Sequence, residues 1–181
     1  MWSRPRVNPL TLLFRYGGVW LGFGVLFTGG LLTIYYSTYL IYSDFLKAIG
    51  MANIIPSVML ISTIAAVVAV LLAGPLALAI NYRWFIIGTL VVSLAYAPIA
   101  LLLYPNFTNL VVLAFIENFA MGLVPYVLID KFDVQYRASG LGGVSYNWGG
   151  LLIGGWAPMI VGLISPPMGL GMVIMMAVGV A

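Results

Sequence analysis

The sequence contains no cysteine and no histidine. Without cysteine there is no disulfide and no thiolate nucleophile, and without histidine there is no imidazole base for hydrolytic catalysis. Metal sites built from cysteine or histidine ligands are excluded for the same reason, as are six-span intramembrane proteases that need a catalytic histidine. We therefore predict that the protein is not an enzyme and that it holds no metal and no cofactor.

Charged residues are also scarce, at 6% of 181 residues, while hydrophobic residues make up 64% and the mean hydropathy is +1.15. Soluble domains carry about 25% charged residues, so this composition predicts a protein whose partner is the lipid bilayer. The net charge of +3 comes from basic residues scattered between apolar runs, which argues against nucleic-acid binding.

Long apolar runs define the expected architecture. A helix needs about 20 residues to cross a hydrocarbon core of roughly 30 Å, and the last run has only about 14 residues, or roughly 21 Å of helix. We expect an all-α, multi-pass transmembrane helical bundle of six spans within a single domain (residues 1–181), with the last span truncated inside the membrane. The predicted spans are 16–42, 54–80, 84–104, 109–129, 138–164 and 168–181.

Basic residues in the short connecting segments predict the orientation. If residues 1–15 form a cytoplasmic basic segment, six basic residues lie inside and one lies outside, as the positive-inside rule requires. We expect a plasma-membrane protein with a cytoplasmic N-terminus. The inside residues are Arg4, Arg6, Arg15, Arg83, Lys131 and Arg137, and the outside residue is Lys47.

Glu117 lies about eight residues into the fourth predicted span, where insertion scales assign a charged group a cost of at least about 2.5–3.5 kcal/mol. Its helical-wheel neighbours Ala114, Ala120 and Met121 place it toward the bundle rather than the lipid. Loss of water favours the neutral form of a carboxyl group. Glu117 is then either a permanently protonated hydrogen-bond donor or a site of proton coupling or substrate contact.

Small residues in the fifth predicted span fall within one narrow stripe of the helical wheel, and Gly150-x-x-x-Gly154 is a small-xxx-small pattern. The stripe indicates either tight helix packing or a sliding surface used during transport. Asn147 would then hydrogen-bond another helix or face a substrate. The stripe consists of Gly140, Gly143, Asn147, Gly150, Gly154 and Pro158.

Tyrosines gather at the end of the first predicted span, in "TIYYSTYLIY". An interfacial aromatic belt accounts for such residues. Tyr35 and Tyr39 are four residues apart and share a helix face, so the other interpretation is that they line an outer vestibule and hydrogen-bond a polar solute.

The segment "DKFDVQYRASG", continued by "LGGVSYNWGGLLIGGWAP", resembles the loop and eleventh helix of the major facilitator superfamily, in particular its metabolite:proton and sugar:proton symporters. Asp133 stands where the family has proline, and Gln135 where a second basic residue is common. The matching positions are Asp130, Phe132, Arg137, Gly140 and the pair Tyr146-Asn147.

The resemblance implies roles for particular residues. Asp130 and Arg137 match a loop network that holds the cytoplasmic side closed, and a plain topology anchor is the alternative. The family's other loop motif is degenerate in "GPLALAINYR": Arg83 fits, whereas Leu78 and Asn81 do not. Arg83 is therefore only a further candidate for the cytoplasmic gate, the loop network that holds the cytoplasmic side closed.

The resemblance also implies that the chain is the C-terminal half, helices 7–12, of a twelve-helix transporter. The expected function is secondary transport of a small organic solute, a metabolite or sugar, coupled to protons. A second six-helix half on another chain, or self-association, would complete the cavity. The alternative is a non-transporting membrane protein that pairs with or regulates another membrane protein; a channel is less favoured because few polar residues lie at mid-span.

Overall fold

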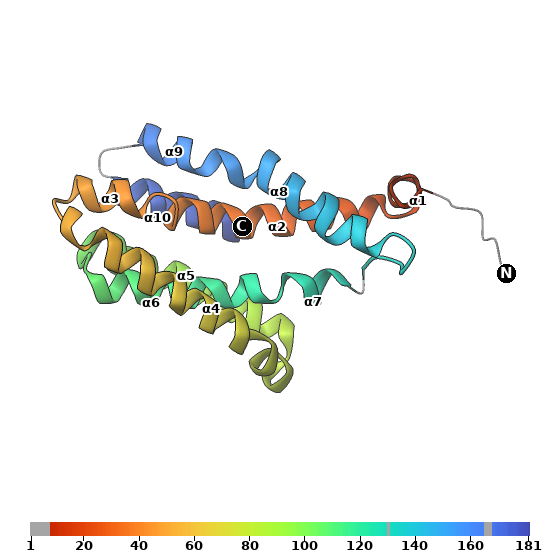
Figure 1. Ribbon diagram of the computed structural model, residues 1–181, viewed down its shortest axis with the longest axis horizontal. Coiled ribbons are helices and arrows are strands. Elements are labelled where there is room, and N and C mark those ends of the chain that lie inside the picture. The colour runs from red at the N-terminus through yellow and green to blue at the C-terminus, as the bar shows by residue number, and fades with distance from the viewer. Residues whose placement is uncertain (1–7, 130, 165–167) are drawn as a thin grey trace.

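The computed structural model describes residues 8–129, 131–164 and 168–181, and this part of the chain is helical with no β-strand (Figure 1). The helices are α1 (Pro9–Tyr16), α2 (Gly18–Thr38), α3 (Tyr42–Ala48), η1 (Ala52–Ile54), α4 (Ile55–Ile80), α5 (Tyr82–Pro98), η2 (Ile99–Leu103), α6 (Phe107–Gly122), α7 (Val124–Ile129), η3 (Ser139–Tyr146), α8 (Asn147–Leu152), η4 (Gly154–Trp156), α9 (Ala157–Ile164) and α10 (Met168–Val180).

Consecutive helices join into five segments that are long and apolar enough to cross a membrane. The all-helical fold predicted from the apolar runs is confirmed for the described residues, and the length and composition of these five segments are consistent with membrane spans. The helix α10, with 13 residues, is apolar but shorter than the other five. The five segments are Gly18–Ala48, Ala52–Ile80, Tyr82–Leu103, Phe107–Ile129 and Ser139–Ile164.

The packing divides the helices into two groups. The helix α2 packs against α10 and against the broken span formed by η3, α8, η4 and α9, whereas α6 packs against α4 and α5. A smaller contact between α2 and α6, together with one between α5 and α10, joins the groups. Figure 1 shows α2 running between α8 and α9 on one side and the α4–α6 group on the other.

Several spans depart from a regular α-helix. Pro98 ends α5, and the following residues wind as a π-helix, η2, because proline donates no backbone hydrogen bond and disturbs the preceding turn. The fifth span starts as a second π-helix, η3, and breaks at Ile153, where φ is −122° and ψ is −67°. Such interruptions are tolerated in a membrane where neighbouring helices satisfy the freed backbone groups.

Polar side chains cap helices at the ends of the bundle. The Asn8 side chain accepts a hydrogen bond from the Leu10 amide at 3.0 Å, and Asn106 accepts one from the Asn109 amide at 2.9 Å. Asn81, which joins α4 to α5, has φ of 91° and accepts a hydrogen bond from the Arg83 amide at 3.1 Å. Asparagine is one of the few residues that adopt positive φ readily, so it suits this tight connection.

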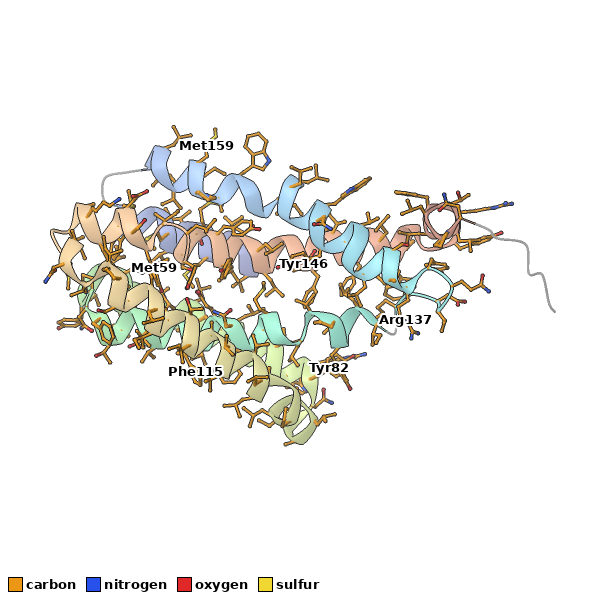
Figure 2. The ribbon with its side chains drawn as sticks, viewed as in Figure 1. Met59, Tyr82, Phe115, Arg137, Tyr146 and Met159 are labelled. Atoms are coloured by element: carbon orange, nitrogen blue, oxygen red, sulfur yellow. The ribbon has the colours of Figure 1, made fainter. Side chains whose placement is uncertain are left out.

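The connections alternate between the two ends of the bundle. Arg137 and Tyr82 lie toward one end and Met59 toward the other (Figure 2). Arg83 follows Tyr82 directly in the sequence, and Lys131 belongs to the same loop as Arg137. Because the helices alternate in direction, the basic residues of these two connections lie at one end of the bundle.

Candidate functional site between α2 and α6

Glu117 is buried where α6 meets α2, with 4% of its surface exposed. Both of its carboxylate oxygens lie within hydrogen-bond distance of one hydroxyl, Thr38 Oγ1, at 3.0 Å and 3.1 Å. Thr38 is fully buried, and its hydroxyl also lies 2.9 Å from the Ile34 carbonyl of its own helix. The expected orientation of Glu117 toward the bundle agrees with this position.

This arrangement suits both protonation states of the carboxyl group. When Glu117 is ionised, the Thr38 hydroxyl donates to it. When Glu117 is neutral, its own O–H can donate to Thr38 Oγ1 while Thr38 donates to the Ile34 carbonyl. A proton can therefore be gained or lost without leaving the Thr38 hydroxyl or the carboxyl group unpartnered.

No cation lies against Glu117 in the described part of the chain. The one ion pair found there joins the exposed side chains of Asp44 and Lys47 on α3, with Nζ to Oδ1 at 3.1 Å. The helix α4 carries no ionisable side chain. Tyr35 of α2 lines the gap beside Glu117, and the Tyr42 hydroxyl of α3 donates to the Leu110 carbonyl of α6. A buried carboxylate without a cationic partner is costly in its charged form.

The space beside Glu117 is narrow. It is bounded by α2 and α6 side chains, among them Leu31, Tyr35 and Asn118, and it does not admit a water molecule. Tyr35 and Asn118 also line a second, larger groove of about 290 Å³ that opens toward α4. Tyr35 and Asn118 thus lie between Glu117 and an accessible groove.

Tyr35 and Tyr39 share one face of α2, as their spacing predicts. Their rings stack with centroids 5.1 Å apart, and the Tyr39 hydroxyl lies 3.3 Å from the Met59 carbonyl and contacts the Thr63 hydroxyl on α4. Both tyrosines line the larger groove. The structure therefore brings Tyr35 and Tyr39 to the neighbourhood of Glu117.

Asn147 does not join this site. Its side chain is exposed, and its Nδ2 donates to the carbonyls of Gly142 at 2.9 Å and Gly143 at 3.1 Å in its own span. It hydrogen-bonds the turn that precedes it and not another helix. The physical reason is the π-helical winding of η3, whose hydrogen bonds join residues five apart and which therefore rotates later residues away from the α-helical wheel.

The small residues of the fifth span pack against α2 in part. A Cβ on Gly150 would lie 3.3 Å from Leu32 Cδ1, and one on Gly154 would lie 2.8 Å from Leu32 Cβ. Gly149, outside the expected stripe, has the closest approach, since its Cβ would lie 2.7 Å from the Gly29 amide nitrogen. Here α2 and α8 meet through backbone.

The remaining two stripe glycines lie elsewhere. A Cβ on Gly140 would lie 2.6 Å from the ring of Phe132, which is buried in the preceding loop. A Cβ on Gly143 would meet only the Ala138 carbonyl at 3.8 Å, so Gly143 packs against no other helix of the described chain. The expectation of one continuous packing stripe is wrong at Gly143, because the π-helical turn shifts the helical phase.

The gate candidates occupy one end of the bundle. Arg137 Nε donates to the Phe132 carbonyl at 3.0 Å, closing the loop on itself, and Asp130 lies outside the described residues. Arg83 Nε donates to the Tyr82 hydroxyl at 3.1 Å and forms no ion pair with a described carboxylate. The structure does not bring Arg83 and Arg137 together through any hydrogen bond.

Thr38, Thr63 and Asn118 belong to the site but were not singled out from the sequence. Thr38 lies three residues after Tyr35, so a shared helix face could have indicated it. Asn118 follows Glu117 directly, and Thr63 is one polar residue in a long apolar span. Only the helix packing places Thr38 against Glu117 and brings Thr63 and Asn118 to the wall of one groove.

No family model matches the chain, and no curated protein or solved structure matches it.

Proposed function

We propose that the chain forms the C-terminal half, helices 7–12, of a major facilitator superfamily transporter that moves a small organic solute across the plasma membrane by proton-coupled secondary transport. The proposal rests on the resemblance of residues 130–147 and on the position of Glu117. A second six-helix half, on another chain or from self-association, supplies the other wall of the cavity, because substrate in such transporters binds at a repeat interface.

The helix packing supports this proposal. In sequence order the six apolar spans form two sets of three. The first span of each set packs against the second and third spans of the other set. Here α2 packs against α8 and α10, and α6 packs against α4 and α5. This reciprocal exchange is the arrangement expected of two related three-helix repeats, such as those nested within half-transporters of this superfamily.

The observation that carries the proposal is the pair Glu117 and Thr38. The pair joins α2, the first span of one set of three, to α6, the first span of the other set. The buried carboxyl group in this contact has hydrogen-bonded arrangements in both protonation states. Intramembrane carboxyl groups of this kind mark proton relays. Glu117 takes up and releases the coupled proton, and Thr38 partners it in both states.

The charge distribution supports an orientation. Arg83, Lys131 and Arg137 lie in connections at one end of the bundle, and Lys47 lies on α3 at the opposite end. The positive-inside rule assigns the more basic end to the cytoplasm. In this orientation the loop that holds Arg137 against Phe132 is the cytoplasmic gate, with Asp130 as the further member implied by the resemblance.

Proteoliposomes test the coupling role. The chain is reconstituted, a proton gradient of either direction is imposed, and accumulation of labelled glucose, lactate and choline is followed as neutral, anionic and cationic probes. We expect gradient-driven accumulation of one probe, with loss of that accumulation in Glu117→Gln.

The matched control is Asp44→Asn, which removes an exposed carboxylate on α3 and should behave as the unsubstituted chain. Full accumulation by Glu117→Gln would overturn the coupling role. Failure of the unsubstituted chain to accumulate any of the three probes would count against transport by this chain.

A further inference from the structure

The groove between α2, α4 and α6 has an unusual balance of groups. It holds about 290 Å³ and is lined by Tyr35, Tyr39, Thr63 and Asn118 among apolar side chains. None of its lining residues is cationic, and the nearest charged group is the carboxyl of Glu117, behind Tyr35 and Asn118. Hydrogen-bond acceptors and the faces of the tyrosine rings therefore determine the electrostatic potential in the groove.

Asn118 supplies one free acceptor. Its side chain is 5% exposed, and its Nδ2 donates to the Ala114 carbonyl of its own helix at 2.7 Å. Its Oδ1 accepts no hydrogen bond from the described residues, although the side chain lines both the groove and the gap beside Glu117. Among the described residues the buried polar atoms without a partner are the Ser62, Ser93 and Ser145 hydroxyls, so Asn118 Oδ1 is not sealed from the groove and can accept a hydrogen bond from a ligand.

The stacked tyrosines supply a second feature. Tyr35 and Tyr39 lie nearly parallel, with 13° between their ring planes, and the contacts of the Tyr39 hydroxyl with Met59 and Thr63 on α4 hold Tyr39 in place. A cation over the face of a tyrosine ring is stabilised by about 0.5–2 kcal/mol, more when it is desolvated. An anion at the same place would face the negative ring surface and the carboxyl of Glu117.

From this juxtaposition we infer that the groove binds an organic cation, an alkylammonium compound, which exchanges with the proton on Glu117. The ammonium group lies over the Tyr35 ring, a donor on the ligand pairs with Asn118 Oδ1, and the ligand charge replaces the proton as the partner of the Glu117 carboxylate. This inference rests on the proposed function and names its substrate class.

Exchange of this kind balances charge and protons. The neutral Glu117 carboxyl gives its proton to water, and the carboxylate that remains pairs with the incoming cation, so one positive charge leaves as another arrives. Tyr35 of α2 lines the gap beside Glu117, the Tyr42 hydroxyl of α3 donates to Leu110 of α6, and α4 carries no ionisable side chain. On α5, which also packs against α6, Arg83 donates to the Tyr82 hydroxyl, and Tyr96 donates to the Asn109 side chain. Glu117 is thus the group whose proton the cation displaces.

Access requires a small movement of Tyr35. The gap beside Glu117 admits no water while Tyr35 separates it from the groove. A change of the Tyr35 side-chain rotamer would join the two spaces, since the ring stacks on Tyr39 rather than being enclosed on all sides. Tyr35 therefore has two roles, as the face that receives the cation and as the barrier before Glu117.

The test uses the purified 181-residue chain in lipid nanodiscs, with choline as the probe, titrated by calorimetry. Its neutral isostere 3,3-dimethyl-1-butanol and the anion 3,3-dimethylbutanoate are titrated alongside. We expect choline to bind at least about tenfold more tightly than either compound, the ratio that 1.4 kcal/mol of charge interaction gives. Choline affinity should fall as the pH is lowered, with about one proton released per cation bound.

Variants separate the named contacts. Glu117→Gln should reduce choline affinity about tenfold or more and abolish proton release, whereas Asp44→Asn should change neither. Tyr35→Phe keeps the aromatic face and should retain binding, and Tyr35→Leu should lose it. Equal binding of choline and its neutral isostere, or unaltered choline binding by Glu117→Gln, would overturn the inference.

The inference and the proposed function fail in different ways. Proton-driven accumulation of glucose or lactate with no binding of choline would remove the organic-cation assignment and leave proton-coupled transport in place. Absence of accumulation for all three probes, together with absence of choline binding, would count against both. Choline binding with proton release and no accumulation would support the cation site and count against transport by the isolated chain.

Discussion

On one side of α2, Gly29 meets Gly149 of α8 so closely that a Cβ on either residue would collide with the partner helix. On the other side, Thr38 reaches Glu117 of α6 through a hydrogen bond, and a groove opens beside it. The first contact is a close approach of glycine backbone to the partner helix, flanked by the side chains of Thr28 and Ile153. The second is made of polar side chains with two hydrogen-bonding arrangements, so the proton exchange proposed for Glu117 takes place at the contact with α6.

The two contacts also differ in what stabilises them. Helices in lipid gain no hydrophobic driving force from meeting each other, so the glycine contact depends on close van der Waals packing. Thr28 adds to it, because its hydroxyl lies 2.7 Å from the Ser145 carbonyl in the π-helical segment η3. The contact with α6 depends instead on satisfying a buried carboxyl group. The glycine contact fixes α2 against α8, whereas the contact between α2 and α6 responds to the protonation of Glu117.

The largest expected effect comes from breaking the glycine contact. Gly149→Val places side-chain carbon against the Gly29 backbone, where a Cβ would lie 2.7 Å from the amide nitrogen. Overpacking against backbone costs about 1–3 kcal/mol or more, so thermal unfolding in detergent should occur at a clearly lower temperature. Gly142→Val is the matched control, because a Cβ there meets nothing within 4 Å. Equal unfolding temperatures for the two variants would contradict this assignment.

The next effect comes from the polar contact. Thr38→Val keeps the shape of the side chain but leaves Glu117 without its hydroxyl partner, at a cost of about 1–3 kcal/mol. Glu117→Gln keeps a hydrogen bond to Thr38 and should be much less destabilised. The double variant Thr38→Val with Glu117→Leu should recover part of the loss. Additive losses in unfolding free energy would show that the two residues are not coupled.

A smaller effect is expected at the loop beyond the glycine contact. Arg137→Ala removes a hydrogen bond to the Phe132 carbonyl, worth about 0.5–1.5 kcal/mol, and should shift the balance between states open to either side of the membrane. Cysteine labelling near the loop measures that balance. Gln135→Ala changes a neighbouring exposed side chain and is the control. Unchanged labelling in Arg137→Ala would argue for a plain topology anchor.

The smallest effect is expected far from both contacts. Asp44→Asn breaks the exposed ion pair with Lys47, and such pairs contribute about 0.2–1 kcal/mol. The unfolding free energy should change by no more than this amount, and the remaining contribution should decrease further in high salt. A larger loss would mean that the Asp44 side chain contributes to stability beyond its exposed ion pair with Lys47.

The sequence by itself determined where the long helices lie and where its one mid-span carboxyl group would be buried. Both follow from one-dimensional properties: the length of apolar runs against the bilayer thickness, and the high cost of Glu117 facing lipid. Tyr35 and Tyr39 were predictable as a pair for a similar reason, since residues four apart share a helix face.

Only the tertiary structure decided which residues complete these features. Thr38 is the partner of Glu117 because α2 and α6 pack together across 79 positions of sequence, which no local pattern encodes. Gly149 replaces Gly143 in the contact with α2, and Asn147 binds its own turn, because η3 winds as a π-helix and changes the phase of the span. A prediction from helical periodicity assumes a regular α-helix. In the fifth span the tertiary structure shows that this assumption fails at η3.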